Sequence, residues 1–416
     1  MRRRWPIAMT AASLASGMLY SLWWAPVVRH HEYWLAPGDL WGTFRLAQQL
    51  DYSSIRDLVL NGSAYLTFPV IVILLAPVAL LTHALHLHAP LFVPGFAHLA
   101  GIHRSSVHPG AWLLVGPAEI LIASSALFAL DALAERLAVP GRRRGALCVI
   151  EAAALWQVDV IWGHPEDALA VALALYALIA ASNQRWTLCG WLFGIALITQ
   201  PLVLLALPVL LAFAPGGSRL SLTLRSAIPP LLARIVPVIA NPHQAITWLA
   251  NQPNYPLIDH PTPWVALAPH LGPGVVGAGP GRMVALLAAA GVGVLALRRR
   301  DDLLAITWLF AVALALRCFF EAVMDPFYIW PAIAIGIVAS AAQPKAWRLG
   351  ATAMAGGGAT VFSFWHLAPW PWWTTLGAIL MAMLIAARPT LHHPLPNRQS
   401  HIAVTATPIR RTPNAS

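Results

Sequence analysis

Long apolar runs, separated by short polar turns, recur along nearly the whole chain. Most are longer than the roughly four to eight residues of a strand, which favours helices. The runs lie at residues 7–28, 111–132, 146–162, 168–181, 187–199, 202–214, 226–240, 282–297, 303–320, 329–342, 349–365 and 373–387. Several are shorter than the ~20 residues that a helix needs to cross the hydrocarbon core, so flanking residues must extend them. The pattern predicts an all-α protein with about twelve transmembrane helices.

Composition strengthens this prediction. Hydrophobic residues make up 58% of the 416 residues, and charged residues only 10%, against roughly 25% in an ordinary soluble domain. Water could not solvate so much apolar surface, so lipid must cover it. A soluble enzyme is therefore excluded, and we expect a polytopic membrane protein. Cys148, Cys189 and Cys318 lie inside apolar runs without the spacing of a metal site, so we expect them to be packing residues.

Basic residues are distributed unevenly, and their positions predict the topology. The net charge is +10, and most of the 26 basic residues fall in seven places. These are residues 2–4, 142–144, 185, 219 and 225, 298–300, 345 and 348, and 388, 398, 410 and 411. Basic loops mark the cytoplasmic side, so both termini are expected there. Nucleic-acid binding would also explain the charge, but the arginines only separate apolar spans and form no basic stripe interleaved with aromatic residues. We expect no nucleic-acid partner.

The longest polar stretch in the first half of the chain, residues 29–68, is placed outside by the basic N-terminus. Within it, residues 39–50 put Leu40, Phe44 and Ala47 on one helical face at i, i+4 and i+7 spacing. This pattern predicts an interfacial helix that lies on the membrane surface.

Residues 69–87 form an apolar run that Pro69 and Pro77 interrupt. If this run crosses the membrane, the span at 111–132 would end with the arginines of 142–144 outside, against the charge rule. If it is a juxtamembrane or re-entrant helix, every later basic loop falls inside. We therefore predict that residues 69–87 do not cross.

The chain divides into two parts by composition. Residues 1–388 hold all the apolar runs and form one membrane-embedded domain without a visible repeat. Residues 389–416 are polar, basic and rich in proline, which predicts a disordered cytoplasmic tail.

Acidic residues concentrate in the loops that this topology places outside. Asp51 and Asp57 are simplest to explain as solubilising groups. Asp39 follows Pro37-Gly38 at the start of the predicted interfacial helix, where its carboxylate would cap the helix. A carboxylate held there could also act as a general base that deprotonates an acceptor hydroxyl.

The sequence Gly163-His164-Pro165-Glu166-Asp167 predicts a tight outer turn between two spans. Three ionisable side chains beside the bilayer are costly unless they bind something, which indicates a ligand site. The structural alternative is that Glu166 and Asp167 occupy the first turn of the next helix, where the macrodipole favours anions.

Residues 317–331 form a third polar segment at the outer boundary. Arg317 and Glu321 are four residues apart, so a salt bridge on one helix face is one explanation. The other is that the Arg317 guanidinium binds a lipid phosphate through two parallel hydrogen bonds. The loop at 241–280 adds amide, imidazole and aromatic groups that suit hydroxyl-rich ligands; they are His243, Gln244, Trp248, Asn251, Asn254, Tyr255, Asp259, His260 and Trp264.

The order of these features resembles that of the GT-C membrane glycosyltransferases, and most closely glycosyltransferase family 87. The resemblance runs from about residue 5 to 345 and rests on features in a fixed order: Asp39-Leu40, the apolar run from Phe68-Pro69 to Ala76-Pro77, an arginine cluster after a span, the turn at Gly163, Gln200-Pro201, and a late arginine followed by Tyr328 and Pro331. It implies an all-helical fold and a polyprenyl-phosphate mannose donor that enters from the membrane.

The resemblance implies an inverting transfer of one sugar, mannose, to the hydroxyl of a lipid or glycan acceptor on the outer face of the cell membrane. Asp39 would be the catalytic base, and Arg317 with His164 would hold the donor phosphate. We assign substrate binding to a further set, Glu166, Asp167, Gln200, Asp325 and Tyr328. A polyprenyl monophosphate leaves with less charge than a nucleotide diphosphate, so we expect no metal and no other cofactor.

A transporter or lipid flippase is the alternative function. The acids Glu119, Asp131, Glu151 and Asp159 lie in or beside predicted spans and could form an ion or proton path. The sequence has no inverted repeat, and its polar residues concentrate on one side, which favours the enzyme. A non-catalytic scaffold is a third possibility.

Overall fold

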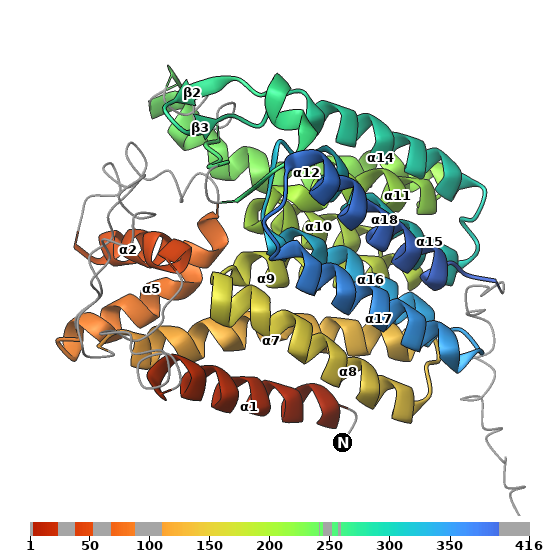
Figure 1. The fold of residues 1–416 in the computed structure, drawn as a ribbon, viewed down its shortest axis with the longest axis horizontal. Helices are drawn as coiled ribbons and strands as arrows, with labels where there is room; N and C mark the ends of the chain where they lie inside the picture. Colours follow the sequence, from red (N-terminus) through yellow and green to blue (C-terminus); the bar gives the residue numbers. More distant parts are fainter. Residues whose placement is uncertain are drawn as a thin grey trace, which may run out of the picture.

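Most helices run side by side along one direction (Figure 1). The computed structural model describes residues 3–23, 38–52, 68–87, 110–240, 242–243, 252–256 and 259–390. Within them the α-helices are α1 (Arg4–Leu19), α2 (Gly38–Tyr52), α5 (Pro69–Ala84), α7 (Trp112–Arg136), α8 (Gly141–Trp156), α9 (Pro165–Ser182), α10 (Trp186–Thr199), α11 (Leu207–Phe213), α12 (Gly216–Ala240), α14 (Gly281–Leu297), α15 (Leu303–Phe320), α16 (Trp330–Ala341), α17 (Ala346–Ser363) and α18 (Pro369–Ala387).

Five helices in the described segments are long and apolar enough to cross a membrane. They are Trp112–Arg136, Gly141–Trp162, Pro165–Ser182, Leu303–Phe320 and Pro369–Ala387. Five shorter apolar helices accompany them: Pro69–Ala84, Trp186–Thr199, Pro201–Phe213, Gly281–Leu297 and Pro326–Ala341. The structure thus agrees with the predicted helical membrane class, while the count of twelve crossings remains a prediction.

Short elements interrupt the helices near their ends. A π-helix, η2 (Gln157–Trp162), continues α8, and the 3-10 helices are η3 (Pro201–Ala206), η4 (Pro263–Leu267) and η5 (Pro326–Ile329). Strand β1 (His260–Pro261) pairs with β4 (Val323–Met324), and β2 (His270–Gly272) pairs with β3 (Val275–Val276), both antiparallel. Strands of two or three residues are too short to show an alternation of apolar and polar positions, so the sequence does not predict them.

Helix boundaries follow the apolar runs closely, with two informative differences. Helix α12 begins at Gly216, ten residues before the predicted run, and includes Arg219 and Arg225. Their guanidinium groups donate to backbone carbonyls close in sequence, those of Ala214 and Ser221. Helix α8 likewise includes residues 142–144, which we had placed in a loop. Arginine near a helix end extends the helix because its long side chain reaches beyond the apolar span.

The central helix of the bundle is α9, which is buried along most of its length. It packs against α7 on one side and α10 on the other. Alanine dominates its sequence, PEDALAVALALYALIAAS, and small residues let neighbouring helix backbones approach closely. The first turn of α9 is therefore surrounded by protein, and this turn holds Glu166 and Asp167.

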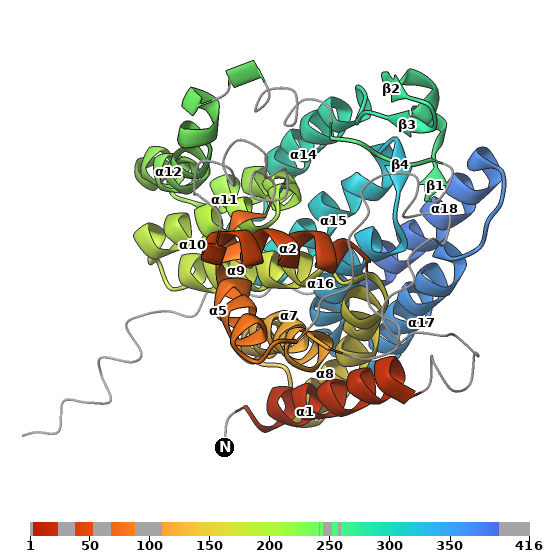
Figure 2. The same cartoon turned by 90° about the vertical axis from the view of Figure 1, so that its left-hand side faces the viewer.

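Helix α2 covers the end of the bundle where α7 begins, as Figure 2 shows. The predicted face of Leu40, Phe44 and Ala47 is buried. It packs in one cluster with residues of α5 and with Trp112 of α7. The prediction that this face rests on the membrane is therefore wrong, since protein covers it.

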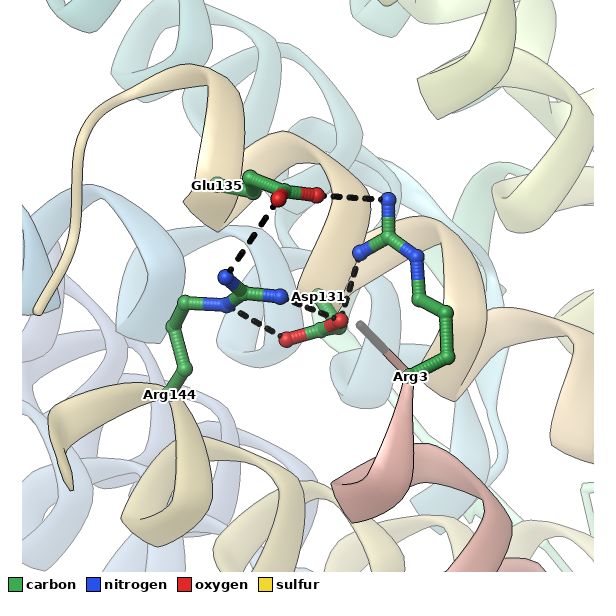
Figure 3. A network of polar contacts seen from close by, with 4 residues as sticks. All are labelled: Arg3, Asp131, Glu135 and Arg144. Atoms are coloured by element: carbon green, nitrogen blue, oxygen red, sulfur yellow. Dashed lines mark hydrogen bonds and ion pairs between the residues drawn. The ribbon is translucent and has the colours of Figure 1, made fainter. Parts of the chain in front are cut away.

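Arginines from two parts of the chain, the start of α1 and the start of α8, meet at the opposite end, which we call the arginine end. Arg3 and Arg144 both pair with Asp131 and with Glu135, as Figure 3 shows. Arg143 donates to the carbonyl of Pro344 at 2.9 Å, so the turn before α17 lies there too. Arg3, the arginines at 143–144 and the turn that leads into the basic stretch at 345–348 thus share one side of the fold, as the charge pattern predicted.

Candidate functional site

A glycine turn brings three ionisable residues into the protein interior. Helix η2 ends at Gly163, whose φ of 72° is the left-handed conformation that closes a helix. The backbone N–H of Gly163 donates to Asp159 O at 2.8 Å. Pro165 then starts α9 at a position that needs no N–H donor. This tight connection places His164, Glu166 and Asp167 at the buried N-terminus of the central helix.

His164 and Glu166 form a close pair. His164 Nδ1 lies 2.6 Å from Glu166 Oε1, and both side chains are buried. The imidazole also stacks on Phe327, with ring centroids 3.9 Å apart and planes 20° apart. Contact with a carboxylate on one side and an aromatic ring on the other fixes the orientation of His164.

Asp167 and Gln200 form a second pair. Gln200 Nε2 donates to Asp167 Oδ1 at 2.8 Å, and Asp167 Oδ2 is buried without a hydrogen-bond partner. Gln200 has extended backbone between α10 and η3, so its side chain can reach across to α9. The structure thus brings together four of the predicted site residues.

Arg317 is the main cation near these acids. Its guanidinium carbon lies 3.0 Å from the centre of the Tyr328 ring, a cation–π contact. The residue is only 8% exposed. Asp167 acts on it electrostatically, but Arg317 forms no ion pair with any residue in the described segments, and its Nε has no hydrogen-bond partner.

The expected alternative for Arg317, a salt bridge to Glu321, is wrong. Glu321 Oε1 accepts hydrogen bonds from Arg282, with Nε at 2.7 Å, and Arg282 also donates to Gln252 Oε1 at 3.1 Å. Helix α15 ends at Phe320, and Glu321 has extended backbone, so it no longer shares the helix face of Arg317. The i, i+4 rule fails because the helix stops between the two residues.

Asp325 and Tyr328 connect the site to the loop that precedes α14. Hydrogen-bonding side chains of Asp259 and Tyr328 lie beside Asp325, and burial raises the pKa of its carboxyl. The β1–β4 pairing holds this loop against the segment that starts η5. His260 stacks on Trp372, with ring centroids 4.4 Å apart. Burial, with His366 nearby, lowers the pKa of His260 to about 4.

Other residues of this loop have different positions. Trp264 Nε1 donates to Phe319 O at 2.9 Å, which is a packing contact. Asn254 pairs with Val276 through the backbone, and His243 is exposed. Gln244, Trp248 and Asn251 lie outside the described residues.

Two acids that we had assigned only to the transporter alternative belong to the same group. Glu119 is fully buried, and neither carboxylate oxygen has a hydrogen-bond partner. Asp159 is also buried, with Oδ1 unpartnered. The charges acting on Glu119 are those of Asp159, Glu166 and His164. A sequence signal existed, since Glu119 interrupts one of the most apolar spans.

We call this group the polar cluster. Its members are Glu119, Asp159, His164, Glu166, Asp167, Gln200 and Arg317. They come from α7, η2, the turn before α9, α9 itself, the end of α10, and α15, so a set of distant segments converges at one end of the bundle.

Asp39 stands in the first turn of α2, which contacts η2. We expected Asp39 to cap the helix from the position before its first residue. Because α2 begins at Gly38, Asp39 lies inside the helix instead. The side chain of Asp39 lies outside the described residues, so its role as base stays a prediction.

The remaining observations concern metal ligands, the cysteines and the comparison with known proteins. Among the residues that the structure places, no three His, Cys, Asp or Glu side chains are grouped as a metal ion would require. Cys148, Cys189 and Cys318 are buried free thiols. No protein-family model matches the chain, and no curated protein sequence matches it either.

Proposed function

We propose that the chain is a membrane glycosyltransferase of the GT-C type that moves a sugar, mannose, from a polyprenyl phosphate to an acceptor hydroxyl. The observation that carries this proposal is Arg317, a buried arginine that forms no ion pair within the described segments and whose Nε has no hydrogen-bond partner there.

A buried charge is costly unless a counter-charge compensates it. A guanidinium binds a phosphate through two parallel hydrogen bonds, and stacking on Tyr328 fixes its plane. A lipid-linked phosphate arriving from the membrane would supply the missing anion. His164 lies beside the same acids and would add a second donor to the phosphate.

In the proposed reaction, Asp39 accepts the proton of the acceptor hydroxyl. The acceptor oxygen forms a bond to the anomeric carbon, and the bond from that carbon to the phosphate oxygen breaks with inversion. The polyprenyl phosphate leaves, and Arg317 stabilises the charge that develops on it. Glu166, Asp167, Gln200, Asp325 and Tyr328 would bind the hydroxyls of the sugar.

The proposed topology puts both termini in the cytoplasm and the polar cluster at the outer face of the cell membrane. It has twelve crossings, and Pro69–Ala84 does not cross. A reporter fused after Gly145 should then be cytoplasmic, and one inserted near His103 external. A cytoplasmic signal near His103 would contradict this topology.

The direct test is transfer of labelled sugar. Purified protein is incubated with polyprenyl-phosphate sugars and candidate lipid or glycan acceptors, with and without a chelator, and we expect transfer in both. Asp39→Asn should lower turnover by at least the ~10²-fold typical of positioned base catalysis and leave donor binding unchanged. Asp51→Asn, at the other end of α2, is the control. Equal turnover of the two variants would refute Asp39 as the base.

A proton-coupled transporter is the second candidate, and a specific observation favours it. Glu119 and Asp159 are buried carboxyls inside apolar helices, and within the described segments both Glu119 oxygens and Oδ1 of Asp159 have no hydrogen-bond partner. Such groups often belong to ion paths. Protein reconstituted in vesicles should then dissipate a pH gradient, and the glycosyltransferase should not.

A further inference from the structure

The polar cluster carries more acids than cations. Four carboxyl groups, those of Glu119, Asp159, Glu166 and Asp167, stand against Arg317 and one histidine. The histidine is paired with Glu166, and Asp167 faces Arg317. Glu119 and Asp159 form no ion pair within the described segments, and the cation that acts on them is the same His164.

These two acids are neighbours of the His164–Glu166 pair. Both members of that pair act electrostatically on Glu119 and on Asp159. The charged groups around Glu119 come from η2, from the turn before α9 and from α9. An independent feature of the cluster indicates an anionic ligand: the buried Nε of Arg317 has no partner, and this guanidinium faces Asp167.

We propose that the polar cluster binds its anionic ligand together with one proton, and that Glu119 and Asp159 hold this proton. The inference rests on the proposed function for the identity of the ligand, a lipid-linked phosphate. The charge of Asp159 acts on Glu119, so in this proposal the two carboxyls form one site for the proton.

The physical reason is charge balance in a medium of low dielectric constant. A phosphate at Arg317 adds negative charge close to Asp167 and to the His164–Glu166 pair, and nearby carboxylates then bind protons more strongly. Glu119 and Asp159 take the proton because, within the described segments, both Glu119 oxygens and Oδ1 of Asp159 lack a hydrogen bond that would favour the charged form. By reciprocity, protonation strengthens binding of the anion.

The experiment measures binding of farnesyl phosphate to the detergent-solubilised full chain between pH 8 and 9. The second pKa of a phosphate monoester is about 6, so the probe itself takes up no proton in this range. If one proton binds with the probe, affinity falls about tenfold for each pH unit. Calorimetry in buffers of different ionisation enthalpy counts the protons directly.

Glu119→Gln and Asp159→Asn should each bind farnesyl phosphate with an affinity that no longer depends on pH. Two variants are used in case one does not fold. Glu151→Gln is the matched control, because Glu151 is buried, lacks a hydrogen-bond partner within the described segments and lies in the same span as Asp159, Gly141–Trp162, but is not a member of the polar cluster. This control should keep the tenfold dependence.

The results distinguish this inference from the proposed function. Absence of binding to the wild-type chain would contradict both. Binding without proton uptake would overturn the inference alone. Uptake that persists in both Glu119→Gln and Asp159→Asn, and disappears in His164→Gln, would move the proton to His164 and also overturn it.

Discussion

Two groups of charged side chains stand at opposite ends of α7 and α8, and they differ in how their charges are paired. At the arginine end, two arginines meet two carboxylates, and each arginine contacts both acids. In the polar cluster, four carboxylates share one arginine and one histidine, and several oxygen atoms have no partner. The same chemistry thus gives a neutral group at one end and an unbalanced group at the other.

The difference separates structural charges from candidate functional ones. A paired group satisfies itself and joins α1, α7 and α8. A buried group of unpaired charges lowers the stability of the fold. Such unpaired charges are typical of a ligand site whose ligand is not bound. Substitutions at the arginine end should therefore change stability, and substitutions in the polar cluster should change binding.

The largest effect is expected for Asp131→Asn. Asp131 is fully buried and bonds Arg3 at 2.5 Å and Arg144 at 2.7 Å. Breaking a buried ion pair by removing one partner costs about 3–5 kcal/mol, so the thermal unfolding midpoint in detergent should fall clearly. Asp301→Asn is the control, because that side chain is 81% exposed and its contact with Arg300 is 3.9 Å long. Similar midpoints for the two variants would contradict a structural role for Asp131.

Arg317→Lys should weaken binding of the probe and leave stability nearly unchanged, the opposite of Asp131→Asn. A point charge replaces the planar fork, and hydrogen bonds to a charged group contribute about 1.5–3 kcal/mol, so farnesyl phosphate should bind roughly 10–100-fold more weakly. The unfolding midpoint should change little, because Arg317 forms no ion pair within the described chain. Arg282→Lys, which alters a paired arginine, should lower the midpoint and keep probe binding. A reversed result would make Arg317 structural.

A double-mutant cycle tests whether Glu321 forms its ion pair with Arg282 or with Arg317. Arg282→Lys with Glu321→Gln should show a coupling energy of about 1 kcal/mol in unfolding measurements, because the two side chains are hydrogen-bonded. Arg317→Lys with Glu321→Gln should be additive. Coupling in the second cycle would restore the helix-face salt bridge that the sequence suggested.

The smallest effect concerns pH and His260. Its pKa is about 4 in the folded chain and about 6.5 in an unfolded one. Between these values the unfolded state binds more protons, so stability is complete above pH 6.5 and is lost as pH falls toward 4. His260→Phe keeps the stack on Trp372 and removes the titration. Its unfolding midpoint should fall less than that of the wild type over this range; equal slopes would contradict the assignment.

The apolar pattern alone determined most helices. The run at 303–320 matches α15 at both ends, because Asp302 caps the helix through Ala305 N at 3.1 Å and the apolar run stops at Phe320. The apolar face of Leu40, Phe44 and Ala47 on one helix and the turn at Gly163 were also predictable, although protein and not the membrane covers that face. These features depend on residues within a few positions of each other, where periodicity and turn geometry decide the conformation.

Tertiary structure decided the partners of the charged residues. The sequence suggested a salt bridge between Arg317 and Glu321, which are four residues apart. In the structure Glu321 binds Arg282, which lies 39 residues before it. In the sequence, Glu119 and Asp159 are only two acids in separate spans. The packing of α7, η2 and α9 makes both of them neighbours of His164. Which side chains meet depends on where helices cross and end, and a distance along the chain does not encode it. The balance of charge at each end of the bundle, and with it the distinction between a structural group and a ligand site, therefore emerged only from the fold.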